Sequence, residues 1–448
     1  MAARQKHRGA ANAAETAALP FNERVLQEVY ELYTEQSNGL VPLAQGLGVH
    51  LLSPRKKITV LILGNHSAGK SSFINWYIEE HVQRVGVAIE TRGFTFVTSG
   101  KHRESLTGHA TLHLYPHFKS LQDFRGVSEY LSTEVSTSKQ KGFNLVTFID
   151  TPGLVDGDMK YPFEVDSVLQ WLGEMADLIF VFFDPMGQAL CKRTLNIVER
   201  LNKSQGDKIR FYLSKADEAG HETDRQRVMM QIVQELCKRP GLNKCGFEMP
   251  TIYIPNANKP SRCLNQIDEV CLTIEKTINQ TVQTTLNQLG RDCEVIVNAA
   301  SQRLMQDCEA GMNNRRAICL GGFLGLLGFF MPATLFLGFI LTSIKDETAV
   351  ALLGADLTGL LHFMCAPLSW CWSLVPHDSQ TMVLLLFLFI CIVLLLCAWF
   401  ICRLQQRLSR RERRKLEGCR DYVNDVICSK KKQLYEEYLQ QSIGEQHC

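Results

Sequence analysis

The pattern of hydrophobic and polar positions divides the chain into two parts of different character. Up to about residue 260, short apolar runs alternate with longer segments whose apolar residues recur at helical spacing. We expect strands and helices respectively, which indicates an α/β fold with a mostly parallel sheet covered on both faces. The predicted strands are 56–64, 93–99, 110–116, 143–150, 176–184, 207–217 and 250–255, and the predicted helices are 70–82, 163–175, 188–204 and 222–238.

The later part contains two long stretches without a formal charge, 317–342 and 380–402. Each exceeds the ~20 residues that a helix needs to cross a hydrocarbon core of ~30 Å, so both are predicted to be transmembrane helices. A buried core helix is the alternative, but such a helix is shorter or has a polar face. The intervening segment 349–375 carries Asp356, which favours an interfacial or re-entrant path over a third span.

The charges that flank these stretches predict the topology. Arg315 and Arg316 precede the first stretch, and a basic run that starts at Arg403 follows the second. Because positive flanks stay on the cytosolic side, both long arms are predicted to face the cytosol. The chain is then a multi-pass protein of an internal membrane, with the endoplasmic reticulum favoured. The sequence leaves open whether Cys402 and Cys419, beside the membrane, are acylated.

Composition narrows the classes of partner. The 448 residues carry a formal net charge of +2, and this near-neutral balance argues against a nucleic-acid partner. The 16 cysteines are scattered without a CxxC pair, as expected for reduced thiols in a cytosol-facing protein. The Ala-rich start has no apolar core of signal-peptide length, so we interpret it as a disordered tail rather than a targeting segment.

A glycine-rich loop follows the first predicted strand. Residues 64–71, GNHSAGKS, match G-x-x-x-x-G-K-[ST] between a strand and a helix, the context in which this motif binds phosphate. Backbone N–H groups and the helix N-terminus bind the diphosphate, Lys70 reaches the β- and γ-phosphates, and the Ser71 hydroxyl ligates Mg²⁺. The candidate nucleotide-binding residues here are Gly64, Asn65, His66, Ser67, Ala68, Gly69, Lys70, Ser71 and Ser72.

A second motif, FIDTPGLVDG at 148–157, supports a nucleotide switch. Asp150 ends an apolar strand, where its carboxylate can hold Mg²⁺ through water, and the N–H of Gly153 can meet the γ-phosphate. Thr91 lies where a mobile loop would bring its hydroxyl over the metal, with Thr95 as the alternative. The candidate catalytic residues are Ser67, Lys70, Thr91 and Gly153, and the candidate metal ligands are Ser71, Thr91 and Asp150.

A base-recognition motif is predicted at LSKAD, 213–217. In the related motif N-K-x-D, the aspartate accepts two hydrogen bonds from guanine and the lysine stem covers the ring. Asp217 and Lys215 fit these roles, whereas Ser214 replaces the asparagine, so GTP is favoured and ATP stays open. Asn256, just after the last predicted strand, is a further candidate nucleotide contact.

The order GNHSAGKSS, TRG, DTPG and SKAD resembles the dynamin superfamily, in particular the branch of the EH-domain ATPases and sarcalumenin. The segments 25–43 and 161–185 are also similar to that branch, and the likeness covers about 22–260. It implies a dynamin-type P-loop G domain and dimers across the nucleotide face. His66 stands where classical dynamins have glutamine, and ATP-binding relatives in this branch keep guanine selectivity a hypothesis. The sequence has no D-x-D-x-D-G calcium loop of an EH domain.

Three histidines, His109, His113 and His117, recur every four residues, a spacing that suits metal ligands on a helix. Their neighbours favour the strand 110–116, on which the imidazoles would lie about 13 Å apart at each step. Metal binding by these histidines is therefore not predicted.

The predicted organisation has six parts. Apolar residues at helical spacing in 264–310 and 403–441 are expected to form a helical bundle with the helix at 25–43. The parts are a disordered tail 1–21, a helical segment 22–55, the G domain 56–262, a helical stalk 263–316, a membrane region 317–402 and a basic helical tail 403–448.

These features together predict a membrane-integral, dynamin-like GTPase that couples Mg²⁺-dependent nucleotide hydrolysis to shaping, tethering, fusion or fission of lipid membranes. Its expected partners are membrane lipid and further copies of itself, and no nucleic acid. Three alternatives stay open: an ATPase like the EH-domain relatives, a nucleotide-gated scaffold with little hydrolysis, and a channel or transporter subunit.

Overall fold

The computed structural model describes residues 19–86, 93–156, 161–186, 190–239, 241–242, 248–256, 261–343 and 379–444, with isolated residues between 359 and 376. The chain splits into two compact units, each described here by itself. The first comprises Met1–Glu294 and Val426–Cys448, and the second comprises Val295–Asp425. Thr91, Asp356 and most of 349–375 lie outside the described residues, so the predictions made for them are untested.

A mixed seven-stranded sheet forms the centre of the first unit, in the order β3-β4-β2-β5-β1-β6-β7. Strand β1 pairs in parallel with β5 and β6, β6 with β7, and β2 with β4, whereas β2 runs antiparallel to β5 and β3 antiparallel to β4. The predicted fold class is confirmed. The strands are β1 (Ile58–Gly64), β2 (Phe94–Ser99), β3 (Glu104–Thr107), β4 (Leu131–Ser136), β5 (Val146–Asp150), β6 (Leu178–Phe183) and β7 (Ile209–Leu213).

Two strand predictions were wrong. Residues 110–116 lie mainly in helix α5 (Gly108–Leu114), which buries Thr111 and Leu112 and exposes His109 and His113. The alternation that suggested a strand is therefore one face of a short helix. Residues 250–255 form only an isolated bridge from Leu213 to Thr251. Strands β3 and β4 were missed because they lie at the polar edge of the sheet, where the hydrophobic alternation is weak.

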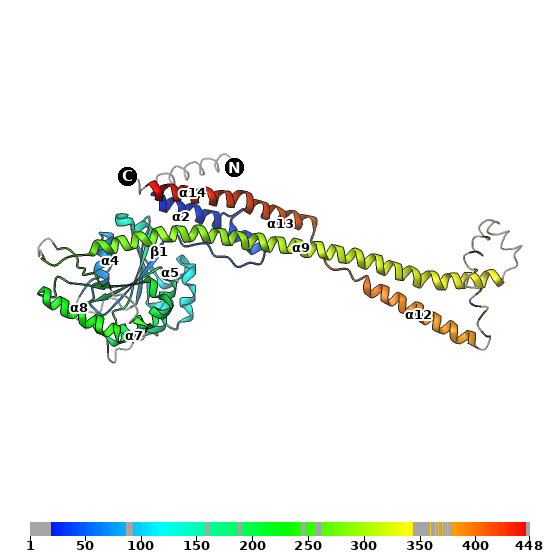
Figure 1. Ribbon diagram of the computed structural model, residues 1–448, viewed down its shortest axis with the longest axis horizontal. Coiled ribbons are helices and arrows are strands. Elements are labelled where there is room, and N and C mark those ends of the chain that lie inside the picture. Colours follow the sequence, from blue (N-terminus) through cyan, green and yellow to red (C-terminus); the bar gives the residue numbers. More distant parts are fainter. Residues whose placement is uncertain are drawn as a thin grey trace. The chain divides into compact units, whose positions relative to one another are not determined.

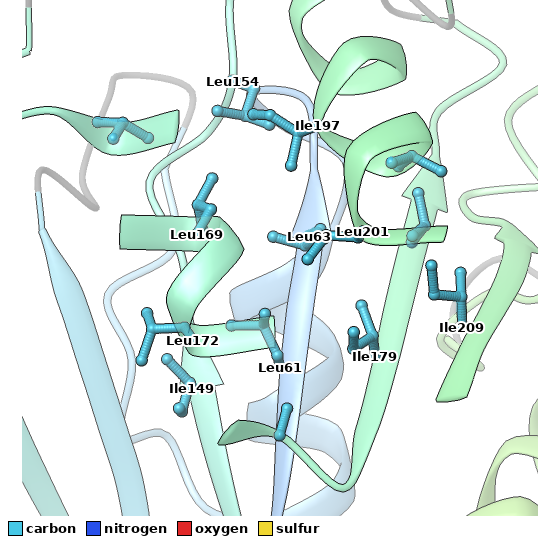
Figure 2. Close-up of a cluster of buried hydrophobic side chains, with 14 of the residues drawn as sticks. Leu61, Leu63, Ile149, Leu154, Leu169, Leu172, Ile179, Ile197, Leu201 and Ile209 are labelled. Carbon is cyan, nitrogen blue, oxygen red and sulfur yellow. The ribbon is translucent and has the colours of Figure 1, made fainter. Parts of the chain in front are cut away.

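Helices cover both faces of the central strands, which explains why every residue of β1, β5 and β6 is buried and most of them are apolar. On one face, side chains of α6 and α7 pack against β1 and β6, as Figure 2 shows for Leu172, Leu201 and Leu61. On the other face, Phe73 of α4 meets aromatic rings of β5 and β6 edge to face. The helices are α4 (Lys70–Ile78), α6 (Val165–Met175), α7 (Lys192–Gln205) and α8 (Glu222–Cys237).

Short elements complete this unit between the main strands and helices. They are α3 (Leu40–Gly46), the 3₁₀ helices η1 (Pro116–Asp123), η2 (Val127–Tyr130), η3 (Gln140–Leu145) and η4 (Gly206–Lys208), and the π-helical turn η7 (Val423–Ile427), which reaches this unit at Val426.

A helical bundle lies beside the sheet in the same unit. It joins α2 (Phe21–Thr34), the first part of α9 (Ile267–Ser343) and α14 (Cys428–Gly444), which run side by side in Figure 1. The Tyr33 hydroxyl of α2 donates to Asp292 of α9 at 2.6 Å, and Arg24 of α2 pairs with Glu437 of α14 at 3.0 Å. The parts of 25–43, 264–310 and 403–441 that belong to this unit therefore contribute helices to one bundle.

The second unit contains the rest of α9, α12 (Gln380–Ile401) and α13 (Arg410–Tyr422). Asn314 of α9 exchanges two hydrogen bonds with the backbone of Gln405, and Asp307 accepts from the backbone N–H of Leu408 at 2.8 Å. A Cβ at Gly328 would lie 3.1 Å from Leu395, so glycine on α9 permits close approach of α12.

By length and composition, α9 and α12 are the two described helices able to cross a bilayer. Only 11% of the most apolar 18-residue stretch of each helix is buried within the protein. A core helix of a water-soluble domain buries far more of its apolar surface, so these helices have the exposure expected of lipid-facing segments.

Candidate nucleotide site

The glycine-rich loop connects the carboxyl end of the central strand β1 to the start of α4. Ser67 and Gly69 both have left-handed backbone conformations, with φ of 61° and 80°. Gly69 caps α4 without a side-chain hydrogen bond, so the first N–H groups of the helix lack a side-chain acceptor. Such a loop directs several N–H groups to one point, and these groups and the positive end of the helix dipole suit an anion.

Lys70, the first residue of α4, is folded back over this loop. Its Nζ donates to the carbonyls of Gly64 at 3.3 Å and of Asn65 at 3.0 Å, and the side chain is buried. Burial lowers the pKa of Lys70 to about 8, while the charge of Asp150 acts in the opposite direction. An anionic ligand beside this ammonium would relieve the cost of burying it.

Ser71 and Asp150 lie together beside Lys70, although one belongs to α4 and the other to β5. The Ser71 hydroxyl donates to Oδ2 of Asp150 at 2.6 Å. The other oxygen, Oδ1, is buried and has no hydrogen-bond partner among the described residues, and burial raises the pKa of the Asp150 carboxyl. A hydroxyl next to an unsatisfied carboxylate oxygen is the all-oxygen donor set that Mg²⁺ prefers, so these residues fit the predicted metal.

The switch segment after β5 is joined to the phosphate loop by backbone hydrogen bonds. The N–H of His66 donates to the carbonyl of Leu154 at 3.1 Å, and the N–H of Leu154 donates to the carbonyl of Gly64 at 3.2 Å. A Cβ at Gly153 would lie 2.6 Å from Cα of His66, so only glycine fits there. His66 and Gly153, predicted separately, are therefore in direct contact.

The two threonine candidates differ in what the structure says of them. Thr95 lies within β2, where it is paired in register with Asp150, and its hydroxyl accepts from Ser132 at 3.3 Å. It belongs to the sheet rather than to a loop that closes over a metal. Thr91 stays the prediction for that role.

The base motif and the phosphate loop line one cavity of about 440 Å³. Asp217 and Lys215 come from the segment after β7, and Gly69 and Ser72 from the loop and α4. The Ser214 hydroxyl donates to the carbonyl of Phe183 at 3.1 Å, which ties the base loop to β6. Of the predicted nucleotide contacts, Gly69, Ser72, Ser214, Lys215, Asp217 and Asn256 line this cavity.

Two residues near the site were missed in the sequence. Asp184, buried just after β6, pairs with Lys215 at 3.6 Å; its place at the end of an apolar strand was a usable signal. Thr194 of α7 donates to Oδ1 of Asn65 at 2.5 Å, a contact that no local pattern indicates. This hydrogen bond fixes the side chain of Asn65 against α7.

Comparison with known proteins agrees with this geometry. Residues 60–216 match the model of the Dynamin family. The chain is 28% identical over 179 residues to EH domain-containing protein 1 of Arabidopsis thaliana, covering 39% of this chain and 32% of that protein. It is 29% identical over 170 residues to EH domain-containing protein 2 of Rattus norvegicus, covering 36% of this chain and 30% of that protein. The match thus spans about a third of the length of these relatives.

Among solved structures, a chain of an oligomerised bacterial dynamin pair, described as a mechanism for long-range sensing and tethering of membranes, aligns with a TM-score of 0.41. The identity is 14%, and the alignment covers 94% of this chain and 78% of that chain.

Proposed function

From its membership of the dynamin superfamily, in the branch close to the EH domain-containing proteins, we propose that the chain is a membrane-anchored nucleoside triphosphatase. It couples binding and hydrolysis of GTP to shaping, tethering, fusion or fission of membranes. It acts with further copies of itself through the G domains and with membrane lipid, and internal membranes such as the endoplasmic reticulum are its proposed location.

One observation carries this proposal. A buried ammonium, a serine hydroxyl and a carboxylate with an unsatisfied oxygen meet at the loop before α4, and a cavity leads from this loop to Asp217. The two ends suit the two ends of a nucleotide, because one offers cationic and N–H groups and the other offers a carboxylate between apolar walls.

Each residue of the loop has a task that its position permits. Lys70 neutralises charge on the β- and γ-phosphates, and the N–H groups of the loop orient the chain of phosphates. Gly153, packed against His66, would donate its N–H to the γ-phosphate, and the exposed Ser67 would lie near the β–γ bridge. Ser71 and Asp150 would hold Mg²⁺, which supplies further charge neutralisation when bound.

The cavity reaches the start of α9, which gives a route from nucleotide to membrane. Ile267, the first residue of α9, lines the cavity. The side chain of Asn265 makes a pair of hydrogen bonds with the backbone of Tyr253, at 2.9 and 3.2 Å. We expect a change in the base loop to move the first turn of α9, and α9 continues into an apolar segment able to cross a bilayer.

The purine is the first point to test. Equilibrium competition between GTP and ATP on the full chain in lipid nanodiscs should favour GTP. Asp217→Asn should weaken that preference by about tenfold or more, because one good bidentate base contact is worth ~1–3 kcal/mol. Equal binding of both nucleotides, unchanged by Asp217→Asn, would exclude the assignment and favour the ATPase alternative.

Hydrolysis is the second point. The chain reconstituted in liposomes should release phosphate from GTP faster than the chain in detergent, if membranes bring G domains together. Tight binding without product under both conditions would instead support a nucleotide-gated scaffold, the alternative that His66 and Ser214 keep open.

A further inference from the structure

A second cavity, of about 550 Å³, lies at the amino ends of the central strands, whereas the phosphate loop follows the carboxyl end of β1. It is lined by Thr59 and Thr147, which are in register near the amino ends of β1 and β5. The nucleotide residues Gly64 and Asp150 end the same two strands. At a rise of about 3.3 Å per residue, roughly 16 Å of β1 and roughly 10 Å of β5 separate the two sites, so this cavity is distinct from the nucleotide site.

The cavity contains a partly buried ammonium, that of Lys57, which has no carboxylate partner among the described residues. Nζ of Lys57 donates to Oγ1 of Thr98 at 2.9 Å and to the carbonyl and hydroxyl of Ser99 at 2.7 Å each. Among the described residues, no carboxylate lies within ion-pair distance of it. The nearest acidic influence is that of Glu23, whose carboxylate accepts from the Asn144 amide. Neutral oxygens satisfy the N–H groups of Lys57, but its charge has no counterion in this part of the chain.

Two further cations line the same cavity. Nζ of Lys56 lies 3.8 Å from the centre of the Tyr30 ring, and burial lowers the pKa of Lys56. Arg55 is committed elsewhere, because it pairs with Asp177 at 2.8 Å. Lys56 and Lys57 therefore leave the cavity with positive charge. Their direct contacts among the described residues are an aromatic face and neutral oxygens, and the nearest carboxylates act on them only from beyond ion-pair distance.

Threonines, serines and His117 contribute to the remaining lining, but most of its surface is apolar, and part of this apolar surface is exposed. Leu52 and Leu114 are 51% and 49% exposed, although both line the cavity. Large aliphatic side chains that stay half exposed beside a cavity offer surface to an apolar ligand. The other apolar members of the lining are Val41, Pro42, Leu51, Pro54, Tyr115, Pro116 and Phe118.

We propose that this cavity binds a single-chain amphiphilic anion, an alkyl phosphate or alkyl carboxylate, whose head meets Lys57 and Lys56 and whose chain lies along Leu52 and Leu114. The volume lies within the ~300–1,000 Å³ of small-molecule sites in proteins. Tyr30 and Thr34 of α2 contribute to one wall and the strand ends to another, so such a ligand would bridge the bundle helix and the sheet. The site is independent of the proposed nucleotide activity.

The test is calorimetric titration of the full chain, in nanodiscs of zwitterionic phosphatidylcholine, with n-octyl phosphate. Inorganic phosphate and n-octanol are titrated separately as the two halves of the probe, and heats from empty nanodiscs are subtracted. The same titrations are run on Lys70→Ala, because a phosphate head could also enter the nucleotide loop. We expect one saturable site for octyl phosphate, at least tenfold tighter than for either half and unchanged in Lys70→Ala.

Variants assign that binding to the cavity. Lys57→Met should weaken octyl phosphate at least tenfold. Lys208→Met is the matched control, because Lys208 is also partly buried and donates to a backbone carbonyl, that of Ala176 at 2.9 Å, but does not line the cavity. Should Lys57→Met fail to fold, Leu52→Ser with Leu114→Ser tests the apolar wall at half-exposed positions, and should bring octyl phosphate toward the affinity of inorganic phosphate.

Three results would overturn the proposal: octyl phosphate binding that survives both Lys57→Met and the double variant, octanol binding as tightly as octyl phosphate, or binding that disappears in Lys70→Ala. Nanodiscs containing lysophosphatidate, a lipid with one acyl chain and a phosphate head, separate two sources of the same chemistry. Competition between this lipid and octyl phosphate supports the site with a bilayer source, and no competition supports it with a soluble one.

Discussion

A lysine lies at each end of strand β1, Lys70 buried and Lys57 partly buried, and the contrast between them shows what a sequence does and does not reveal. Lys70 follows the carboxyl end of β1, and Lys57 precedes its amino end. Burial lowers the pKa of both side chains to about 8. Lys70 has a carboxylate nearby, that of Asp150, and a loop of N–H groups, whereas Lys57 is held by hydroxyl and carbonyl oxygens of β2.

The first lysine belongs to a contiguous motif, and the second to a site assembled from distant segments. A phosphate loop is recognisable because its spacing is imposed by local backbone geometry. The second cavity draws its lining from segments between Tyr30 and Thr147, so no short pattern could have indicated it. Substitutions and pH changes at the two sites should therefore have separate effects.

The largest effect is expected at Gly153. The methyl group in Gly153→Ala would lie 2.6 Å from Cα of His66, which is closer than van der Waals contact. The switch segment must therefore move away from the phosphate loop. Misplacement by about 1 Å can reduce turnover by roughly 10²-fold, and we expect a loss of that size in GTP hydrolysis. Steady-state phosphate release measures this loss of turnover, and the affinity of the second cavity for octyl phosphate should stay the same. Wild-type turnover in this variant would show that the contact is not needed.

The next effect concerns Asp150. Asp150→Asn removes a buried charge whose carboxyl pKa is raised, so the nucleotide-free protein should unfold at a higher temperature. Affinity for Mg²⁺-nucleotide should fall about 10–100-fold, as hydrogen bonds to charged groups are worth ~1.5–3 kcal/mol. Differential scanning calorimetry and titration with and without Mg²⁺ measure the two changes. A lower melting temperature together with unchanged affinity would mean that Asp150 is only structural.

The affinity of the second cavity for octyl phosphate should depend on pH. The pKa of Lys57 is lowered to about 8 in the folded chain, so its positive charge is lost as the pH rises through that value. Octyl phosphate affinity should therefore fall up to about tenfold per unit between pH 8 and 9.5. Lys57→Arg, which stays charged, should bind with little change over this range. A flat profile for the wild type would show that the head group does not meet Lys57.

The same shift affects stability. Because the folded pKa of Lys57 lies below its unfolded value, the unfolded chain binds more protons above pH 8, and the free energy of unfolding gains from this residue as the pH rises toward 10.5.

The smallest effect is expected at Tyr33. Tyr33→Phe removes the hydroxyl that donates to Asp292, at a cost of about 1–3 kcal/mol in the free energy of unfolding. Since α2 contributes to one wall of the second cavity through Tyr30 and Thr34, octyl phosphate should bind a few-fold more weakly while nucleotide affinity stays constant. Chemical denaturation and the two titrations check this. An equal loss of affinity for octyl phosphate and for nucleotide would mean that the two sites are not independent.

The sequence predicted the central strands because they are buried on both faces and form continuous apolar runs, as β1 and β6 show. It failed at the edge, where β3 and β4 are polar, and at 110–116, where a short helix resembles an alternating strand. In the site, Lys70, Ser71 and Asp150 meet as expected. The partnership of Asn65 with Thr194 joins segments far apart in the chain, and only the fold reveals it.

The most direct test of the central claim is equilibrium binding of GTP, with Mg²⁺, to the full chain in nanodiscs. Lys70→Ala is compared with Lys203→Ala, which removes an exposed lysine of α7 outside both cavities. We predict at least tenfold weaker binding for Lys70→Ala and wild-type affinity for Lys203→Ala. Undiminished nucleotide affinity in Lys70→Ala would contradict the account.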